Sequence, residues 1–206
     1  MKTLLTLAIA LLFAAPISFA STPKSAAAKS SAANAETNLS VGGTITWTGT
    51  GVGKSHTGTL LVKSGEVKMK GSEVLGGQFV LDMNSIAYSN PRLVGHLKSP
   101  DFFDVEKFPE AKFVIKKSEP IKKVGADKIT HKLMGELTIK DKTQPIEFGA
   151  ILTPGAAGTS AKGTILIADR TAYGINYNSK KFKALSELGD KMINDEIKLE
   201  LDLTAK

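Results

Sequence analysis

Alternation of apolar and polar residues constrains this chain more than any other feature, and it begins near residue 40. Between residues 197 and 203 every odd position is aliphatic and every even position is charged. The run 129–139 repeats the pattern, with four aliphatic residues on one face and mainly Thr, Lys and Glu on the other. A period of two puts successive side chains on opposite sides of a β-strand, so the chain is predicted to consist mainly of strands with one buried face.

Turn-forming residues divide the pattern into about eight strands. The shorter alternating runs lie at 57–63, 78–83, 112–116, 144–152 and 163–169. Glycine, asparagine and proline clusters such as 153–158 separate them, with hairpin-like spacing. This arrangement predicts an all-β, antiparallel fold, either an up-and-down barrel or a sandwich.

Alternation alone does not separate a soluble barrel from an outer-membrane barrel, because only the direction of the apolar face differs. The polar face carries Lys, Glu or Asp in nearly every predicted strand. Aromatic residues make up only 6% of the chain, too few for the two aromatic girdles of a membrane barrel. Both observations favour the soluble form.

The segment 89–110 interrupts the alternation. Asn90-Pro91 and Ser99-Pro100 each place a preferred N-cap residue before a proline, which is typical of a helix start. Two short helical turns are therefore expected here, covering one end of the sheet.

The N-terminus predicts export. Met1-Lys2 precedes an apolar run, Leu4–Ala15, and Ser18-Phe19-Ala20 supplies the small residues that a signal peptidase recognises. A membrane anchor is the alternative, but Pro16 interrupts the run and no basic cluster follows it. Residues 1–20 are thus expected to be a signal peptide cleaved after Ala20, which places the protein in the periplasm.

An Ala/Ser-rich stretch follows the predicted signal. Residues 21–38 contain no Leu, Ile, Val or Phe, so they cannot bury enough apolar surface to fold and are expected to form a flexible tether. The folded domain is then expected to span 39–206, a size sufficient for one core.

Catalytic and metal-binding signatures are sparse. The chain has no cysteine, which excludes disulfides, thiolate metal sites and cysteine nucleophiles. Its three histidines, His56, His96 and His131, lie at no metal-ligand spacing, and no nucleophile elbow, phosphate loop or dinucleotide motif occurs. No catalytic residue, metal site or catalytic cofactor is therefore assigned.

The net charge of +7 is modest for 206 residues. Lys122-Lys123 and Lys180-Lys181 are small basic clusters without interleaved aromatic residues, so nucleic acid is not an expected partner. A basic rim that attracts an anionic head group remains an alternative to a merely solvated surface.

Several motifs resemble those of the YceI-like family of secreted, lipocalin-like proteins. The main one is the segment from His96 to Phe113, HLKSPDFFDVEKFPEAKF. Thr46–Thr50 with Lys54–Gly58 resembles the family's opening strands, and Gly135–Pro145 resembles its Gly-x-Leu-Thr-x-x-x-x-Thr-x-Pro hairpin. Arg170–Gly174 resembles part of its C-terminal region.

The resemblance implies an eight-stranded antiparallel lipocalin-like barrel with short helical turns capping one region and an apolar lumen. It also implies a bound polyisoprenoid, such as a prenyl quinone or prenyl phosphate, or another long-chain lipid. No catalysis is established for the family in general. Relatives and edge strands together suggest a homodimer, and unloading of a lipid suggests transient membrane contact.

Eight strands enclose a space for about one slender ligand. The residues expected to face the lumen are Phe79, Leu81, Met83, Phe113, Ile115, Leu133, Leu137, Ile139, Phe148, Ile165, Ile167, Leu199 and Leu201. The residues expected at the mouth or head group are His96, Phe102, Phe103 and Phe108.

Three functions follow as hypotheses. The first, which the sequence favours, is a periplasmic protein that holds a long-chain isoprenoid for transport, storage or sequestration. The second is an enzyme that acts on a bound lipid through His96 or His131. The third is a non-catalytic stress or scaffold protein that meets a protein partner through its tether and an aromatic patch at 102–108.

Overall fold

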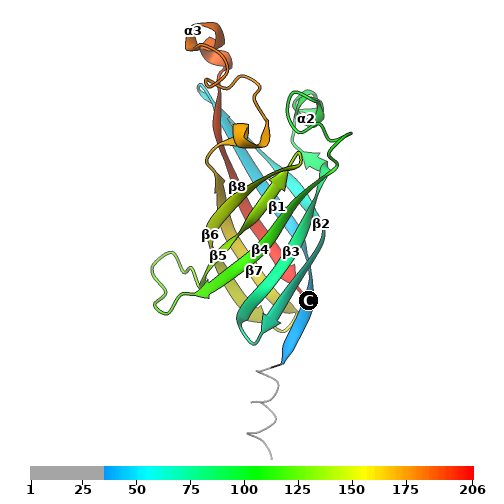
Figure 1. Ribbon diagram of the computed structural model, residues 1–206, viewed down its shortest axis with the longest axis vertical. Helices are drawn as coiled ribbons and strands as arrows, with labels where there is room; N and C mark the ends of the chain where they lie inside the picture. Colours follow the sequence, from blue (N-terminus) through cyan, green and yellow to red (C-terminus); the bar gives the residue numbers. More distant parts are fainter. Residues whose placement is uncertain (1–34) are drawn as a thin grey trace, which may run out of the picture.

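Eight antiparallel strands close into a single barrel in the computed structural model, which describes residues 35–206 (Figure 1). The strands are β1 (Glu36–Gly51), β2 (Lys54–Lys70), β3 (Glu73–Ala87), β4 (Glu110–Pro120), β5 (His131–Ile139), β6 (Lys142–Gly155), β7 (Gly158–Ile167) and β8 (Ile193–Ala205). The barrel confirms the predicted fold class and excludes the sandwich. The predicted signal peptide and residues 21–34 of the predicted tether lie outside the described residues.

The seam between the first and last strands closes the barrel. β1 pairs with β8 from Val41 opposite Ala205 to Gly51 opposite Ile193, and on its other side β1 pairs with β2. Each strand thus has two hydrogen-bonded neighbours in the described chain. The expectation of free edge strands, on which the homodimer prediction partly rested, is therefore wrong. The homodimer itself stays a prediction.

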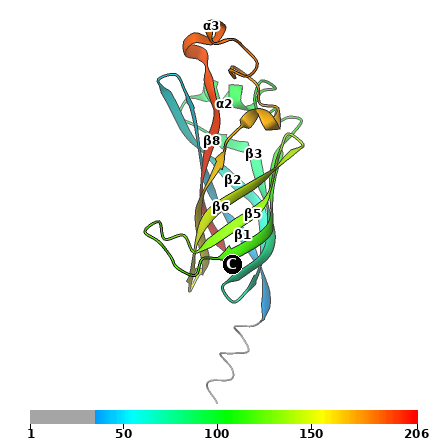
Figure 2. The same ribbon diagram turned by 60° about the vertical axis from the view of Figure 1, so that its left-hand side comes forward.

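Long strands make the barrel a narrow tube (Figure 2). β2 has 17 residues and β1 has 16, whereas strands in globular proteins most often have about 5–6. The first strand begins at Glu36, three residues before the predicted start of the domain, because Glu36 to Leu39 pair with the end of β2.

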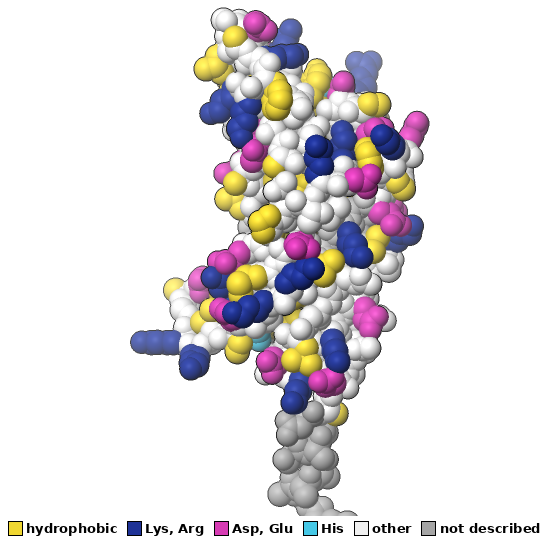
Figure 3. Space-filling view, in the orientation of Figure 1, with side chains coloured by type: hydrophobic (Ala, Val, Ile, Leu, Met, Phe, Trp, Pro, Cys, Tyr) yellow, Lys and Arg dark blue, Asp and Glu magenta, His cyan; other side chains and the backbone are white. Residues whose placement is uncertain are grey.

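The apolar face of each strand points into the tube. Residues of β5 alternate between buried and half-buried along its whole length, with the aliphatic side chains on the buried side. On the outer face, cross-strand ion pairs such as Lys116–Glu136 at 3.0 Å and Lys132–Glu147 at 2.7 Å join neighbouring strands. Figure 3 shows this mixed charged surface.

Short helical segments gather at one end of the tube. α2 (Pro91–Lys98) begins as predicted, because the Asn90 side chain accepts a hydrogen bond from the Arg92 amide at 3.0 Å. The predicted second helical turn at Ser99-Pro100 is wrong. Ser99 ends α2, and its carbonyl accepts from the Phe102 and Asp104 amides in tight turns, with Asp104 in the left-handed region.

The link between β7 and β8 holds the other helical segments. They are η1 (Arg170–Tyr173), α3 (Leu185–Leu188) and η2 (Gly189–Lys191). None of them was predicted from the sequence. Within residues 35–206, no helix has both the length and the apolar character to cross a membrane.

Gly135 packs closely against an aromatic ring and Gly42 does not, so alanine substitutions at these two positions should differ in their effect on stability. A Cβ added at Gly135 would lie 2.7 Å from Cζ of Phe113 and would also meet the Val114 carbonyl, whereas Gly42 has nothing within 4 Å. Gly135→Ala should lower the free energy of unfolding by about 1–3 kcal/mol. Gly42→Ala should change it by less than about 0.5 kcal/mol. Urea unfolding of both variants checks this, and equal effects would contradict it.

Candidate functional site

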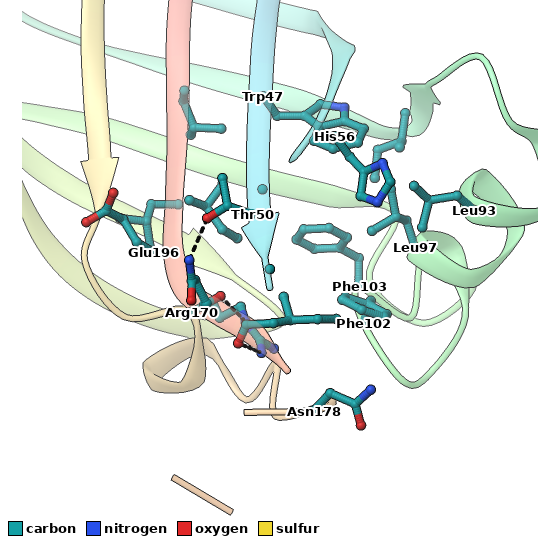
Figure 4. A pocket seen from close by; sticks show the side chains of 18 of the residues that line it. Trp47, Thr50, His56, Leu93, Leu97, Phe102, Phe103, Arg170, Asn178 and Glu196 are labelled. Carbon is teal, nitrogen blue, oxygen red and sulfur yellow. Dashed lines mark hydrogen bonds between the residues drawn. The ribbon is translucent and has the colours of Figure 1, made fainter. Parts of the chain in front are cut away.

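The helical end of the tube contains an apolar cavity of about 300 Å³. Side chains from β1, β3, β8, α2 and the turn after α2 surround it. Figure 4 shows Leu93, Leu97, Phe102 and Phe103 on one side of this space and Arg170 with Glu196 on another. The volume lies at the lower end of the range of small-molecule pockets, about 300–1,000 Å³.

A second, smaller cavity of about 50 Å³ has a wholly apolar side-chain lining except for Lys162. Leu81, Leu137 and Leu199 line both cavities and so form a constriction between them. The two cavities therefore lie in line within one lumen.

The predicted lumen residues fall into these two cavities, with one exception. Those that line the larger cavity are Leu81, Met83, Leu137, Ile139, Ile167 and Leu199. Those that line the smaller one are Phe79, Leu81, Phe113, Leu133, Leu137, Phe148, Ile165, Leu199 and Leu201. Ile115 is buried but lines neither cavity. Contact of any of these residues with a ligand stays a prediction.

Three phenylalanine rings narrow the smaller cavity. Phe79 and Phe113 stack with ring centroids 6.2 Å apart, and Phe148 lies 5.7 Å from Phe113 in a tilted arrangement. Gly135 leaves room for the Phe113 ring, as described above, and Gly65 does the same for Phe79. These rings set the depth to which an apolar chain could enter.

The predicted mouth residues separate into two pairs. Phe102 and Phe103 line the larger cavity. His96 does not; it packs edge-on against Phe102 and Tyr177 at centroid distances of 4.9 and 4.7 Å, with Nε2 3.0 Å from Asp101 Oδ2. Phe108 also lies outside the lining, beneath Lys107.

The predicted aromatic patch at 102–108 is only partly exposed. Phe102 is only 6% exposed, because His96 and Tyr177 cover it on the outside and the cavity lies on its inner side. A protein partner therefore has no access to this ring, whereas Phe103 and Phe108 are half-buried, so contact of a partner with the patch stays a prediction.

A buried arginine, which sequence reasoning missed, organises the mouth. Arg170 is 1% exposed and donates to four backbone carbonyls between residues 175 and 194. Nη1 donates to Ile175 at 2.7 Å, Nη2 to Tyr177 at 2.9 Å and Ile193 at 3.2 Å, and Nε to Asn194 at 3.1 Å. The guanidinium thereby joins the chain before α3 to the start of β8.

The charge of Arg170 is compensated locally. Burial lowers the pKa of Arg170, while Asp195 and Asp169 act in the opposite direction. Oδ1 of Asp195 lies 3.5 Å from Nη2, and the Asp195 side chain is 9% exposed. Arginine remains protonated in proteins, so the pair is an ion pair at the rim of the lumen.

Other lining residues could have been found from the pattern. Ile193 and Ile197 share the face of Leu199 and Leu201, and both line the larger cavity. Trp47 lines it too, from the strand that pairs with β8. Arg170 begins the family-like motif Arg170–Gly174, but the alternating pattern does not indicate its role, because its partners are backbone carbonyls 5 to 24 residues further along the chain.

The three histidines lie apart from one another. Nδ1 of His56 is 3.0 Å from the Tyr88 hydroxyl at the mouth, and His96 lies outside the lining. His131 is buried, with Nδ1 2.9 Å from the Thr130 hydroxyl. Across residues 35–206, no three His, Asp or Glu side chains gather as metal ligands would.

Comparison with known proteins identifies the family to which this barrel belongs. The model of the YceI-like domain matches residues 26–205. The chain belongs to the YceI-like family. Among curated relatives, the UPF0312 protein of Staphylococcus aureus strain USA300 is 32% identical over 123 residues, which cover 57% of this chain and 63% of that protein. This YceI-like chain thus matches less than two thirds of the length of such relatives.

Solved structures share the fold. BcnA of Burkholderia cenocepacia superposes with a TM-score of 0.63 at 19% identity, covering 81% of this chain and 96% of that one. A polyisoprenoid binding domain from Saccharophagus degradans, implicated in plant cell wall breakdown, gives 0.56 at 13% identity, covering 82% and 97%. These two likenesses show a common barrel.

Removal of the Arg170 guanidinium should destabilise this YceI-like domain. Arg170→Met would leave Asp195 buried without its cation, a change that typically costs about 3–5 kcal/mol. Lys181→Met is the control, because Lys181 contacts Asp169 at the surface and should leave stability nearly unchanged. Thermal and urea unfolding measure both, and an Arg170→Met variant as stable as the wild type would refute the assigned role.

Acid should weaken the fold through His131. Burial lowers the pKa of His131 from 6.5, against a smaller opposing effect of a backbone hydrogen bond to Ser72. The unfolded chain therefore binds a proton first as the pH falls through 6.5, so stability is lost below that pH.

His131→Leu isolates this contribution. The free energy of unfolding of the wild type should fall more steeply than that of the variant between about pH 7.5 and about pH 5.5. An NMR titration of the His131 ring provides the direct check. Parallel pH profiles, or a His131 pKa above 6.5, would contradict the prediction.

Proposed function

We propose that this YceI-like protein binds a long-chain isoprenoid or a similar lipid, with its tail in the lumen and its head group at the mouth. The observation that carries the proposal is the distribution of polarity along the tube. The constriction is apolar and so is the smaller cavity except for Lys162, whereas charged and amide side chains also line the larger cavity, namely Lys54, Arg170, Asn178, Asp190, Lys191, Asn194 and Glu196.

The energetics suit a hydrocarbon tail. Burial of aliphatic carbon contributes ~0.8 kcal/mol per methylene, so ten buried carbons would gain ~8 kcal/mol before ordering costs. A lumen with two cavities in line accommodates an extended chain rather than a bulky ring system. Leu81, Leu137 and Leu199 would have to adjust their rotamers for a tail to pass the constriction.

The mouth favours a head group that accepts hydrogen bonds. Lys54 and Lys191 supply positively charged donors at the larger cavity, beside the carboxylates of Asp190 and Glu196. The Asn178 and Asn194 amides each donate one N–H to the protein, to the Lys191 carbonyl and the Thr50 hydroxyl respectively, and each has a second N–H for a head group. Quinone carbonyls and prenyl phosphate oxygens both meet this requirement. The polyisoprenoid binding domain of Saccharophagus degradans, which has the same fold, supports a ligand of this class.

Residues 1–20 support action in the periplasm, where such a carrier would transport, store or sequester its lipid. The proposal assigns no chemical step to the protein and no catalytic residue. Its lipid would enter and leave intact.

Filling the lumen tests the proposal. Met83→Trp and Ala111→Phe add bulk at two buried positions that line the larger cavity from different strands. Leu166→Trp is the matched control, because Leu166 is 52% exposed on the outer face of β7. The wild type and Leu166→Trp should take up a prenyl quinone or prenyl phosphate presented in detergent, and the filled variants should retain less than about a tenth as much.

Native mass spectrometry of each incubated protein gives the occupancy, and circular dichroism shows whether each variant is folded. Two outcomes oppose the proposal. One is that the wild type takes up neither lipid. The other is that both filled variants fold and load as fully as Leu166→Trp.

A further inference from the structure

The segment between Asn178 and Met192 carries the most exposed apolar side chains of the described chain. Phe182 is 58% exposed and Leu185 is 62% exposed, the two highest fractions among its large hydrophobic residues. Figures 1 and 2 show this segment projecting beyond the strands at the α3 end. Leu188 is 3% exposed and Ser179 is fully buried, so the segment is anchored by these two side chains while Phe182 and Leu185 face solvent.

Lysines surround the two exposed side chains. The segment contains four lysines, at 180, 181, 183 and 191, against two acidic residues, Glu187 and Asp190. Lys181 is engaged with Asp169 at 2.6 Å, and Lys183 lies over the Tyr177 ring with Nζ 6.0 Å from its centroid. Lys183 directly follows Phe182 in the sequence, and Lys180 precedes it by two residues. Figure 3 shows Lys/Arg and hydrophobic side chains gathered around this projecting end.

The β1–β2 hairpin extends the same surface. The Val52 amide donates to the Met192 carbonyl at 3.3 Å, which holds the hairpin against the end of the segment. Val52 is 45% exposed, and Lys54 follows it in the chain. We call the set Val52, Lys54, Lys180, Phe182, Lys183 and Leu185 the docking tip.

The docking tip adjoins the opening of the lumen. Val52 and Lys54 belong to the lining of the larger cavity, as do Asp190, Lys191 and Met192 at the end of the segment. An apolar tail that leaves the cavity here would meet the exposed apolar side chains of the tip.

We infer that the docking tip is a membrane-binding surface that seats the mouth of the barrel on an anionic bilayer. Phe182, Leu185 and Val52 would enter the interfacial region, and the lysines would contact lipid phosphates while their aliphatic stems lie along apolar surface. The inference rests on the proposed function, because it supplies the route by which a lipid passes between the bilayer and the lumen.

The opposite end of the barrel provides a matched control. The loop 121–130 also combines exposed apolar residues, Ile121 at 37% and Val124 at 50%, with Lys122 and Lys123. None of its residues lines either luminal cavity. If any basic and apolar loop were enough to bind membranes, the two ends would behave alike.

The test compares two tip variants with one loop variant. They are Phe182→Ser with Leu185→Ser, Lys180→Glu with Lys183→Glu, and, as control, Lys122→Glu with Lys123→Glu. Sedimentation with phosphatidylethanolamine–phosphatidylglycerol vesicles measures binding. The tip lysine variant should bind at least about 25-fold more weakly, the product of roughly fivefold for each of the two lysines. The loop variant should bind like the wild type.

Transfer of a prenyl lipid from such vesicles should slow by at least about tenfold in both tip variants. Their occupancy with lipid presented in detergent should equal that of the wild type, because the lumen is unchanged. Met83→Trp should show the reverse, with normal vesicle binding and little lipid uptake.

Distinct results overturn the two proposals. Wild-type vesicle binding and transfer rates in both tip variants would overturn the docking surface, as would equal losses in the loop variant. Failure of the wild type to load lipid from detergent would instead overturn the proposed function. Equal binding of the wild type to phosphatidylcholine vesicles and to anionic vesicles would refute the electrostatic part of the inference.

Discussion

The hydrogen-bonded seam between β1 and β8 is the contact on which the rest of the molecule depends. Without it the sheet would have two free edges, and its apolar face would need another layer to cover it. Closure instead turns every apolar face toward one axis. The long strands then extend this interior into a tube, and side chains fill it only in part.

The two ends of the tube differ because of what joins the strands. At one end α2, the turns after it and the long β7–β8 link surround the larger cavity. Arg170 holds that link to the barrel through four carbonyls, so a single buried cation gives a long connection a defined shape. The same connection carries Phe182 and Leu185 outward, which joins the cavity and the docking tip in one structural unit.

The barrel and its inner face were predictable because both follow from a period of two. The same parity placed Leu81 and Leu137 in the lumen, and Asn90-Pro91 marked the start of α2 from local chemistry alone. Ser99-Pro100 has the same sequence signal, but the predicted second helical turn does not form, because the turn that ends α2 and the left-handed Asp104 reverse the chain there.

Non-local interactions account for the features that the sequence pattern did not reveal. Arg170 begins a family-like motif, but its role as a donor to main-chain carbonyls is visible only in the tertiary structure. From the sequence, Phe102 was expected to belong to an exposed aromatic patch, but in the structure His96 and Tyr177 pack against its ring. The closed seam likewise depends on register between the two ends of the domain, so the strand pattern alone left barrel and sandwich equally open.

The central claim is that the lumen holds a lipid tail, and native mass spectrometry of the protein purified from its own cell envelope tests it most directly. The account predicts a single retained adduct with the mass of a prenyl quinone or prenyl phosphate, identified after extraction. A protein that has no adduct, and stays unliganded after incubation with such lipids, would contradict it.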